Sequence, residues 1–211
     1  MIRHLRKVPA VAFGLSAVGA TIQTALGRDT NRYGLPDMSM PALTATLALA
    51  TKPGRTRDAA TVALLAGTAG DMSSSLTFKI GWFALGHISY IAAFASSDKL
   101  SLAPKVTQCR RWWPIGAAIL VAGVWASARA EGLRPACVLY ACLVAAMTVT
   151  ASGYSRLAGA SALMFALSDF LIGFGMWRAK RQTAWGRALI VSTYLLAQAG
   201  LTAAVIKEEG K

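Results

Sequence analysis

Two carboxylates lie inside apolar stretches of the sequence, where a charged side chain is costly. The chain has nine acidic residues, and only Asp71 and Asp169 fall within such stretches. Asp169 lies in LMFALSDFLIGFG (Leu163–Gly175), and Asp71 lies in LLAGTAGDMSS (Leu64–Ser74). A carboxylate at the centre of a bilayer costs roughly 2.5–3.5 kcal/mol on insertion scales, so its presence indicates a functional site. We therefore treat these two aspartates as the candidate catalytic residues.

A pair of carboxylates in a pocket of low dielectric constant can do acid–base chemistry. The two carboxylates cannot easily be ionised at the same time, so one of them is held protonated. A general acid and a general base are then available side by side at neutral pH. Such a pair suits hydrolysis of an acid-labile bond in a lipid, and it suits proton transfer by a small proton-coupled transporter equally well. The residues alone leave these two functions open, together with a structural or lipid-sensing membrane protein.

Further polar side chains lie at helical spacing inside other apolar segments. His87 shares one helical stripe with Phe83, and it is the one histidine outside the N-terminal tail. Its type and place are compatible with a structural hydrogen bond and with a chemical role. One histidine and two aspartates on separate helices are a thin ligand set, so we expect no metal. The remaining polar candidates are Tyr90, Tyr140, Tyr194 and Gln198.

The composition predicts that these residues sit in a membrane protein. Hydrophobic residues make up 55% of the 211 residues and charged residues only 15%, below the roughly 25% charged residues of soluble domains. The net charge of +13 comes from Lys and Arg in short breaks between apolar blocks, where such residues anchor loops and set topology. No basic face or RNA-binding motif accompanies the charge, so we expect no nucleic-acid partner.

The apolar blocks predict an all-α, polytopic helix bundle that forms a single transmembrane domain over residues 1–211. About 20 residues cross a bilayer, and eight segments of about that length or somewhat shorter can be recognised. The first is expected to be a retained helix and not a signal peptide. A seven-helix count is the alternative, because the second segment is the weakest. The expected spans are Val8–Leu26, Met38–Thr51, Asp58–Ser74, Phe78–Ser97, Trp112–Ala128, Pro135–Ala151, Arg156–Trp177 and Trp185–Ile206.

Eight spans would give the two aspartates a similar depth. The third and seventh spans then run in the same direction, with Asp71 and Asp169 each 13 residues after the first residue of its span. At about 1.5 Å per residue, both carboxylates would lie roughly 20 Å from the same boundary. The two segments also resemble each other, so a parallel repeat of four plus four helices is one possible organisation. The Lys and Arg distribution favours both termini on the inner side.

Taken together, the pattern resembles the lysoplasmalogenase family, the YhhN-like multi-pass membrane proteins. The resemblance runs over most of the chain from about Lys52 onward, and it depends on the order and spacing of short motifs. These motifs are Lys52-Pro53, Gly70-Asp71, FKIGWFALGHISY at Phe78–Tyr90, Gly159-Ala160, Phe165, Ser168-Asp169, Tyr194 and Gln198.

The resemblance implies hydrolysis of the vinyl ether bond of a lysoplasmalogen, without a cofactor, by Asp71 and Asp169. The partners would be a lysophospholipid substrate and membrane lipids, and the sequence does not give the oligomeric state. Lys52 would hold the substrate phosphate, although it is expected on the inner side, far from the aspartates. The Ala- and Arg-rich composition indicates a high-GC bacterium, so we expect a bacterial cell membrane. The other residues expected to line the cavity are His87, Tyr90, Tyr140, Tyr194 and Gln198.

Overall fold

The computed structural model describes residues 8–27, 35–97, 109–178 and 182–210, and within these ranges it contains eight α-helices and no β-strand. A short 3₁₀ turn, Ser127–Arg129, follows α7, and a π-helical turn, Phe174–Arg178, follows α9. The α-helices are α2 (Val8–Ala25), α3 (Leu35–Ala50), α4 (Arg55–Met72), α5 (Leu76–Ser96), α7 (Trp113–Ala126), α8 (Arg134–Tyr154), α9 (Arg156–Gly173) and α10 (Ala184–Glu209).

The predicted all-α class is confirmed, and each of the eight expected spans overlaps one of these helices. Five of the described helices, α2, α5, α8, α9 and α10, are long and apolar enough to cross a membrane. Helices α3 and α7 are apolar but shorter. Helix α4 has 18 residues, four of them charged: Arg55, Arg57, Asp58 and Asp71. A count of eight membrane spans and a four-plus-four repeat therefore stay predictions.

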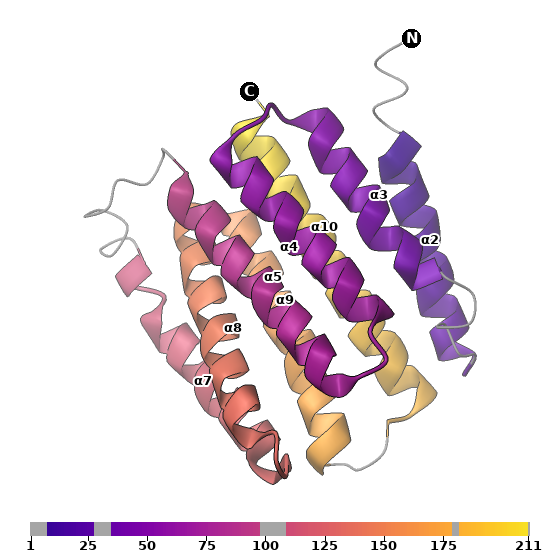
Figure 1. Cartoon of the computed structure of the whole chain (residues 1–211), viewed down its shortest axis with the longest axis vertical. Helices are drawn as coiled ribbons and strands as arrows, with labels where there is room; N and C mark the ends of the chain where they lie inside the picture. Colours follow the sequence, from indigo (N-terminus) through magenta and orange to yellow (C-terminus); the bar gives the residue numbers. More distant parts are fainter. Residues whose placement is uncertain (1–7, 28–34, 98–108, 179–181, 211) are drawn as a thin grey trace.

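The helices lie side by side along the long axis of the molecule (Figure 1). Neighbours in sequence pack against each other from α2 to α5 and from α7 to α10. Four long-range helix pairs join these halves, because α5 packs against α8 and α10 packs against α2, α3 and α4. Helix α10 thus packs against four other helices, α2, α3, α4 and α9. Its C-terminal end lies beside the connection between α3 and α4 (Figure 1).

Helices α4 and α9 run in the same direction, as the sequence predicts (Figure 1). Asp71 is the next-to-last residue of α4, and Asp169 lies four residues before the end of α9. Both aspartates therefore lie toward the same end of the bundle, where the α4–α5 connection and the end of α9 are found. We call this the acidic end of the molecule.

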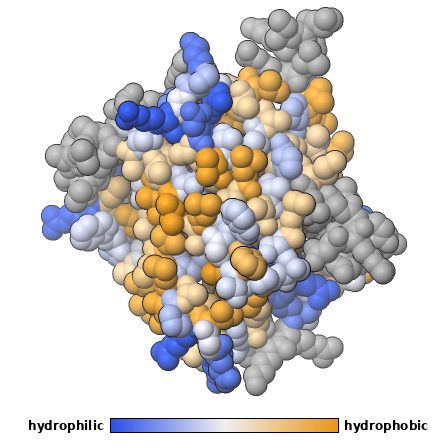
Figure 2. All heavy atoms as spheres, in the orientation of Figure 1, coloured by the Kyte–Doolittle hydropathy of each residue, from blue (hydrophilic) through white to orange (hydrophobic). Residues whose placement is uncertain are grey.

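The surface and the core both fit a lipid environment. Figure 2 shows hydrophobic residues over the middle of the visible face and hydrophilic residues toward its two ends. Inside, small residues let helices approach closely, which is typical of membrane bundles. A Cβ on Gly159 of α9 would lie 2.7 Å from the Ser152 hydroxyl of α8, and a Cβ on Gly200 of α10 would collide with the Ser161 hydroxyl of α9.

Candidate active site

Asp169 is held by two polar side chains from neighbouring helices. The hydroxyl of Tyr140, on α8, donates to Oδ2 of Asp169 over 3.1 Å. The same oxygen lies 3.5 Å from Nε2 of His87, on α5, and that nitrogen lies 2.9 Å from the Tyr140 hydroxyl. His87 is almost fully buried, whereas the Asp169 side chain is 17% exposed. Three helices thus bring a histidine, a tyrosine and a carboxylate into one hydrogen-bonded group.

Asp71 accepts a hydrogen bond from a different tyrosine. The hydroxyl of Tyr194, on α10, donates to Oδ2 of Asp71 over 3.0 Å. The close fit depends on Gly67, one turn earlier on α4, where a Cβ would lie 3.2 Å from the Tyr194 hydroxyl. The absence of a side chain at Gly67 therefore makes room for the tyrosine hydroxyl that donates to Asp71.

A buried layer lies beside these two groups. Tyr90 donates to Oε1 of Gln198 over 2.6 Å, which joins α5 to α10. The ring of Phe165 meets His87 edge-on at 4.8 Å and Tyr194 edge-on at 5.5 Å, measured between ring centroids. Of the predicted site residues, the structure brings together all but Lys52. The two aspartates belong to separate tyrosine groups connected through this layer.

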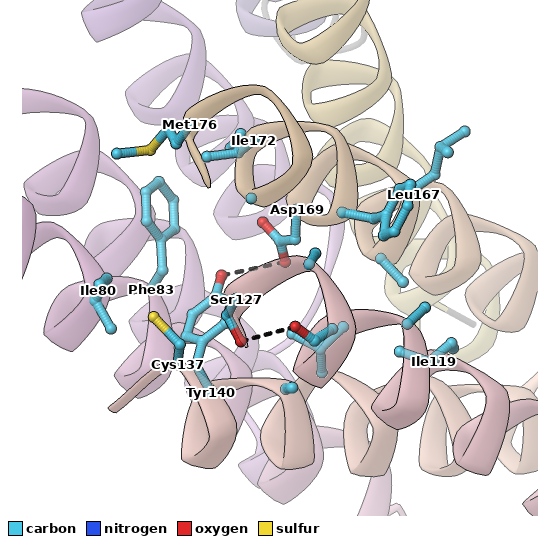
Figure 3. Close-up of a pocket in the computed structure, with 18 of the residues that line it drawn as sticks. Ile80, Phe83, Ile119, Ser127, Cys137, Tyr140, Leu167, Asp169, Ile172 and Met176 are labelled. Carbon is cyan, nitrogen blue, oxygen red and sulfur yellow. Dashed lines mark hydrogen bonds between the residues drawn. The ribbon is translucent and has the colours of Figure 1, made fainter. Parts of the chain in front are cut away.

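An apolar pocket with a cavity volume of about 480 Å³ lies on the Asp169 side of this layer. Helices α5, α7, α8 and α9 line it, and the π-helical turn after α9 contributes Met176 and Trp177. Asp169 and Tyr140 face each other in the close-up of this pocket (Figure 3). Asp71 is not among the pocket's lining residues. Pockets of about 300–1,000 Å³ with few polar groups are typical of sites for small apolar ligands.

This arrangement leaves one oxygen of Asp169 for chemistry. The described contacts of the carboxylate use Oδ2, so Oδ1 is not engaged by another described side chain. When Nε2 of His87 carries a proton, it can donate to the Tyr140 oxygen while Tyr140 donates to Asp169. Such a chain polarises its members and fixes the carboxylate in place. Within the described ranges, no group of three or more His, Cys, Asp or Glu residues could hold a metal ion.

Lys52 lies away from this group. It is exposed and precedes α4, whereas Asp71 lies in the last turn of that helix. The 18 residues of α4 place them roughly 27 Å apart along the helix axis. The separation already implied by the sequence is therefore present in the structure, and Lys52 is not part of the pocket.

The sequence interpretation missed Lys79, which lines the pocket from the first turn of α5. A signal was present, because Lys79 lies four residues before Phe83 and eight before His87. Residues four apart share one face of a helix, so the stripe that contains Phe83 and His87 extends back to this lysine. Phe83 itself lines the pocket and meets the Tyr194 ring edge-on at 5.8 Å.

One comparison with known proteins gives a match. The model of the YhhN family matches residues 31–205, which is most of the chain. No curated protein and no solved structure matches the chain at a significant level.

Proposed function

The chain belongs to the YhhN family, and we propose that it is a membrane hydrolase that cleaves the vinyl ether bond of lysoplasmalogens. The products would be a fatty aldehyde and a glycerophospho-ethanolamine or glycerophospho-choline. The observation that carries this proposal is the position of Asp169, which Tyr140 fixes at the wall of an apolar pocket. An acid at an apolar wall is what an acid-labile bond in a lipid requires.

The reaction would begin with protonation of the β-carbon of the vinyl ether by Asp169 in its acid form. The C=C electron pair forms the new C–H bond, and the α-carbon becomes part of an oxocarbenium ion. Asp169, now a carboxylate, takes a proton from water as the water oxygen adds to the α-carbon. The hemiacetal then collapses to the aldehyde and the glycerol hydroxyl, with one water consumed. Positioned acid–base catalysis of this kind contributes about 10²–10⁴-fold.

Asp71 would have a second, electrostatic role in this proposal. It holds the hydroxyl of Tyr194, whose ring contacts Phe83 at the pocket wall. Its negative charge would favour the cationic intermediate across the aromatic layer, because charges interact over several ångströms in a medium of low dielectric constant. The two aspartates would thus act as a pair, each held by its own tyrosine.

The pocket favours a lipid substrate over the polar solute of a transporter. Of its 24 lining residues, Lys79, Ser127, Tyr140 and Asp169 are among the few with polar side chains. A hydrocarbon chain needs no hydrogen bonds from such walls, whereas a polar solute would lose its water contacts without replacement. A proton-coupled transporter with the same carboxylates remains the function against which the proposal is tested.

Aldehyde release from lysoplasmalogen by the purified protein in detergent tests the proposal. We expect turnover by the wild type, a kcat reduced at least about 10²-fold in Asp169→Asn, and a smaller reduction in Asp71→Asn. Asp58→Asn is the matched control, because Asp58 is an exposed carboxylate in the first turn of α4, paired with Arg57. Its kcat should equal that of the wild type.

Two results would count against the proposal. A folded wild-type protein that releases no aldehyde from lysoplasmalogen or related alkenyl ether lipids is not this hydrolase. Proton-driven uptake by the protein in liposomes, lost in Asp169→Asn, would assign the carboxylates to a transporter.

A further inference from the structure

The pocket that contains Asp169 also contains a cation. Lys79 is the one basic residue among the described residues that line it. Its side chain is partly buried, and no ion pair joins it to another described residue. Most of the remaining lining is aliphatic or aromatic. A single cation on an otherwise apolar wall is suited to a ligand with one anionic group and a long apolar part.

The position of Lys79 near the N-terminal end of α5 also favours binding of an anion. Lys79 lies in the first turn of α5, which contains no acidic residue. The N-terminal end of a helix carries a partial positive charge, so a lysine there is repelled by its own helix. An anion bound beside Lys79 would be attracted by both charges.

The rise along α5 between Lys79 and His87 is comparable with the length of a glycerophosphate. Lys79 precedes His87 by eight residues, which is about 12 Å along α5, and His87 lies against Asp169. In a lysoplasmalogen, six bonds separate the phosphorus from the α-carbon of the vinyl ether. An extended arm of that length, about 7 Å, with one contact of about 3 Å at each end, spans roughly 13 Å.

We infer that Lys79 binds the phosphate of a lysophospholipid whose ether bond lies at Asp169. This inference rests on the proposed function for the identity of the reacting bond. The phosphate then lies at the acidic end of the bundle, and the hydrocarbon chain extends past Asp169 toward Ile115, Ile119 and Leu163, which line the same pocket. Lys79 takes the role that the family resemblance suggested for Lys52.

Two substrates that differ only in the phosphate test this role. We expect Lys79→Gln to raise KM for lysoplasmalogen about tenfold and to leave KM for the corresponding 1-alkenylglycerol unchanged. Lys79→Arg, which keeps the charge, should restore most of the affinity for lysoplasmalogen. Arg129→Gln removes a charge at the same end of the bundle from a residue that does not line the pocket, and it should behave as the wild type.

Equal changes for both substrates, or no change in Lys79→Gln, would overturn the inference. If KM for lysoplasmalogen rose in Lys52→Gln and not in Lys79→Gln, the phosphate would bind at Lys52, beside the first residues of α4. Calorimetric titration with a saturated ether lysophospholipid and with the matching alkylglycerol separates this inference from the proposed reaction. Binding that depends on the phosphate and on Lys79, in a protein without hydrolase activity, would support the site and refute the reaction. Binding of the two ligands with equal affinity would refute the site.

Discussion

Tyr140 connects the two other polar members of the Asp169 group. Its hydroxyl donates to Asp169 and lies within hydrogen-bond distance of His87. Without it, His87 would remain 3.5 Å from Oδ2 of Asp169, too far for a short hydrogen bond. In the proposed reaction the tyrosine therefore positions the carboxylate that transfers the proton.

Removal of the Tyr140 hydroxyl should affect kcat more than KM. We expect Tyr140→Phe to lower kcat for lysoplasmalogen about 10–100-fold, because a misplaced general acid loses part of its 10²–10⁴-fold contribution. The substrate phosphate and chain keep their contacts, so KM should change little.

Tyr154→Phe is the matched control for this prediction. Tyr154 lies on the same helix, but its hydroxyl donates to Glu209 at the opposite end of the bundle. Its loss should lower Tm and leave kcat unchanged. Equal kcat values in Tyr140→Phe and the wild type would show that the tyrosine has no part in positioning Asp169.

The sequence predicts the types of the site residues better than it predicts which side chains bind each other. Asp71 and Asp169 can be identified because a carboxylate in an apolar run is costly. Their partners cannot be assigned, because Tyr194 lies 123 residues from Asp71 and the pairing depends on which helix faces which. Lys79 is overlooked because a lysine near the start of a span is usually an interface anchor.

The close packing of helix α4 against helix α10 at Gly67, and not a single contact, sets the position of Asp71. The hydroxyl of Tyr194 lies 3.2 Å from the place of a Cβ on Gly67, and Nε2 of Gln198 lies 3.4 Å from it. Neither side chain has free space to withdraw without loss of a hydrogen bond, since Tyr194 binds Asp71 and Gln198 binds Tyr90. Helices α4 and α10 approach closely because this position has no side chain.

Gly67→Ala should therefore destabilise the protein. Overpacking of a tight site costs roughly 1–3 kcal/mol, and we expect the lower part of that range with a lower Tm in detergent. Gly81→Ala on α5 is the control, because a Cβ there meets nothing within 4 Å. Its Tm should be no lower than that of the wild type. A Gly67→Ala protein with unchanged Tm would mean that α4 and α10 can separate at no cost.

The helices themselves follow from the sequence because the apolar blocks are long and polar breaks separate them. Their ends are less predictable: α4 begins at Arg55 and not at Asp58, and α8 continues to Tyr154 beyond the expected Ala151. In both places, helix continues into polar residues that hydropathy alone assigns to a loop. The packing of α5 against α8 has no signal in either segment, because both are apolar over most of their surface.

The two ends of the bundle hold different polar groups. Helices α4 and α9 both run toward the acidic end, where Lys79 is also found. The opposite end has Lys52, and Glu209 there accepts hydrogen bonds from Ser97 and Tyr154. The ends of α5, α8 and α10 are thus fastened together far from the site, which leaves the acidic end to accommodate substrate.

Single-cysteine labelling in intact cells tests how these ends face the membrane. In a protein whose native cysteines are replaced by serine, Gly54→Cys and Gly210→Cys should react only after the membrane is made permeable, as the inside location of both termini predicts. Glu131→Cys, on the connection between α7 and α8, should react from outside. The reverse pattern would invert the orientation and leave the bundle unchanged.

The placement of both carboxylates at one end also has a consequence for lipid traffic. A substrate whose phosphate is held at that end enters from the adjacent leaflet, so the protein would consume lipids of one leaflet and leave the other untouched. Turnover in a cell would then depend on how quickly lysolipids cross the bilayer. The water-soluble product would leave on the side where the phosphate entered, while the aldehyde would remain in the membrane.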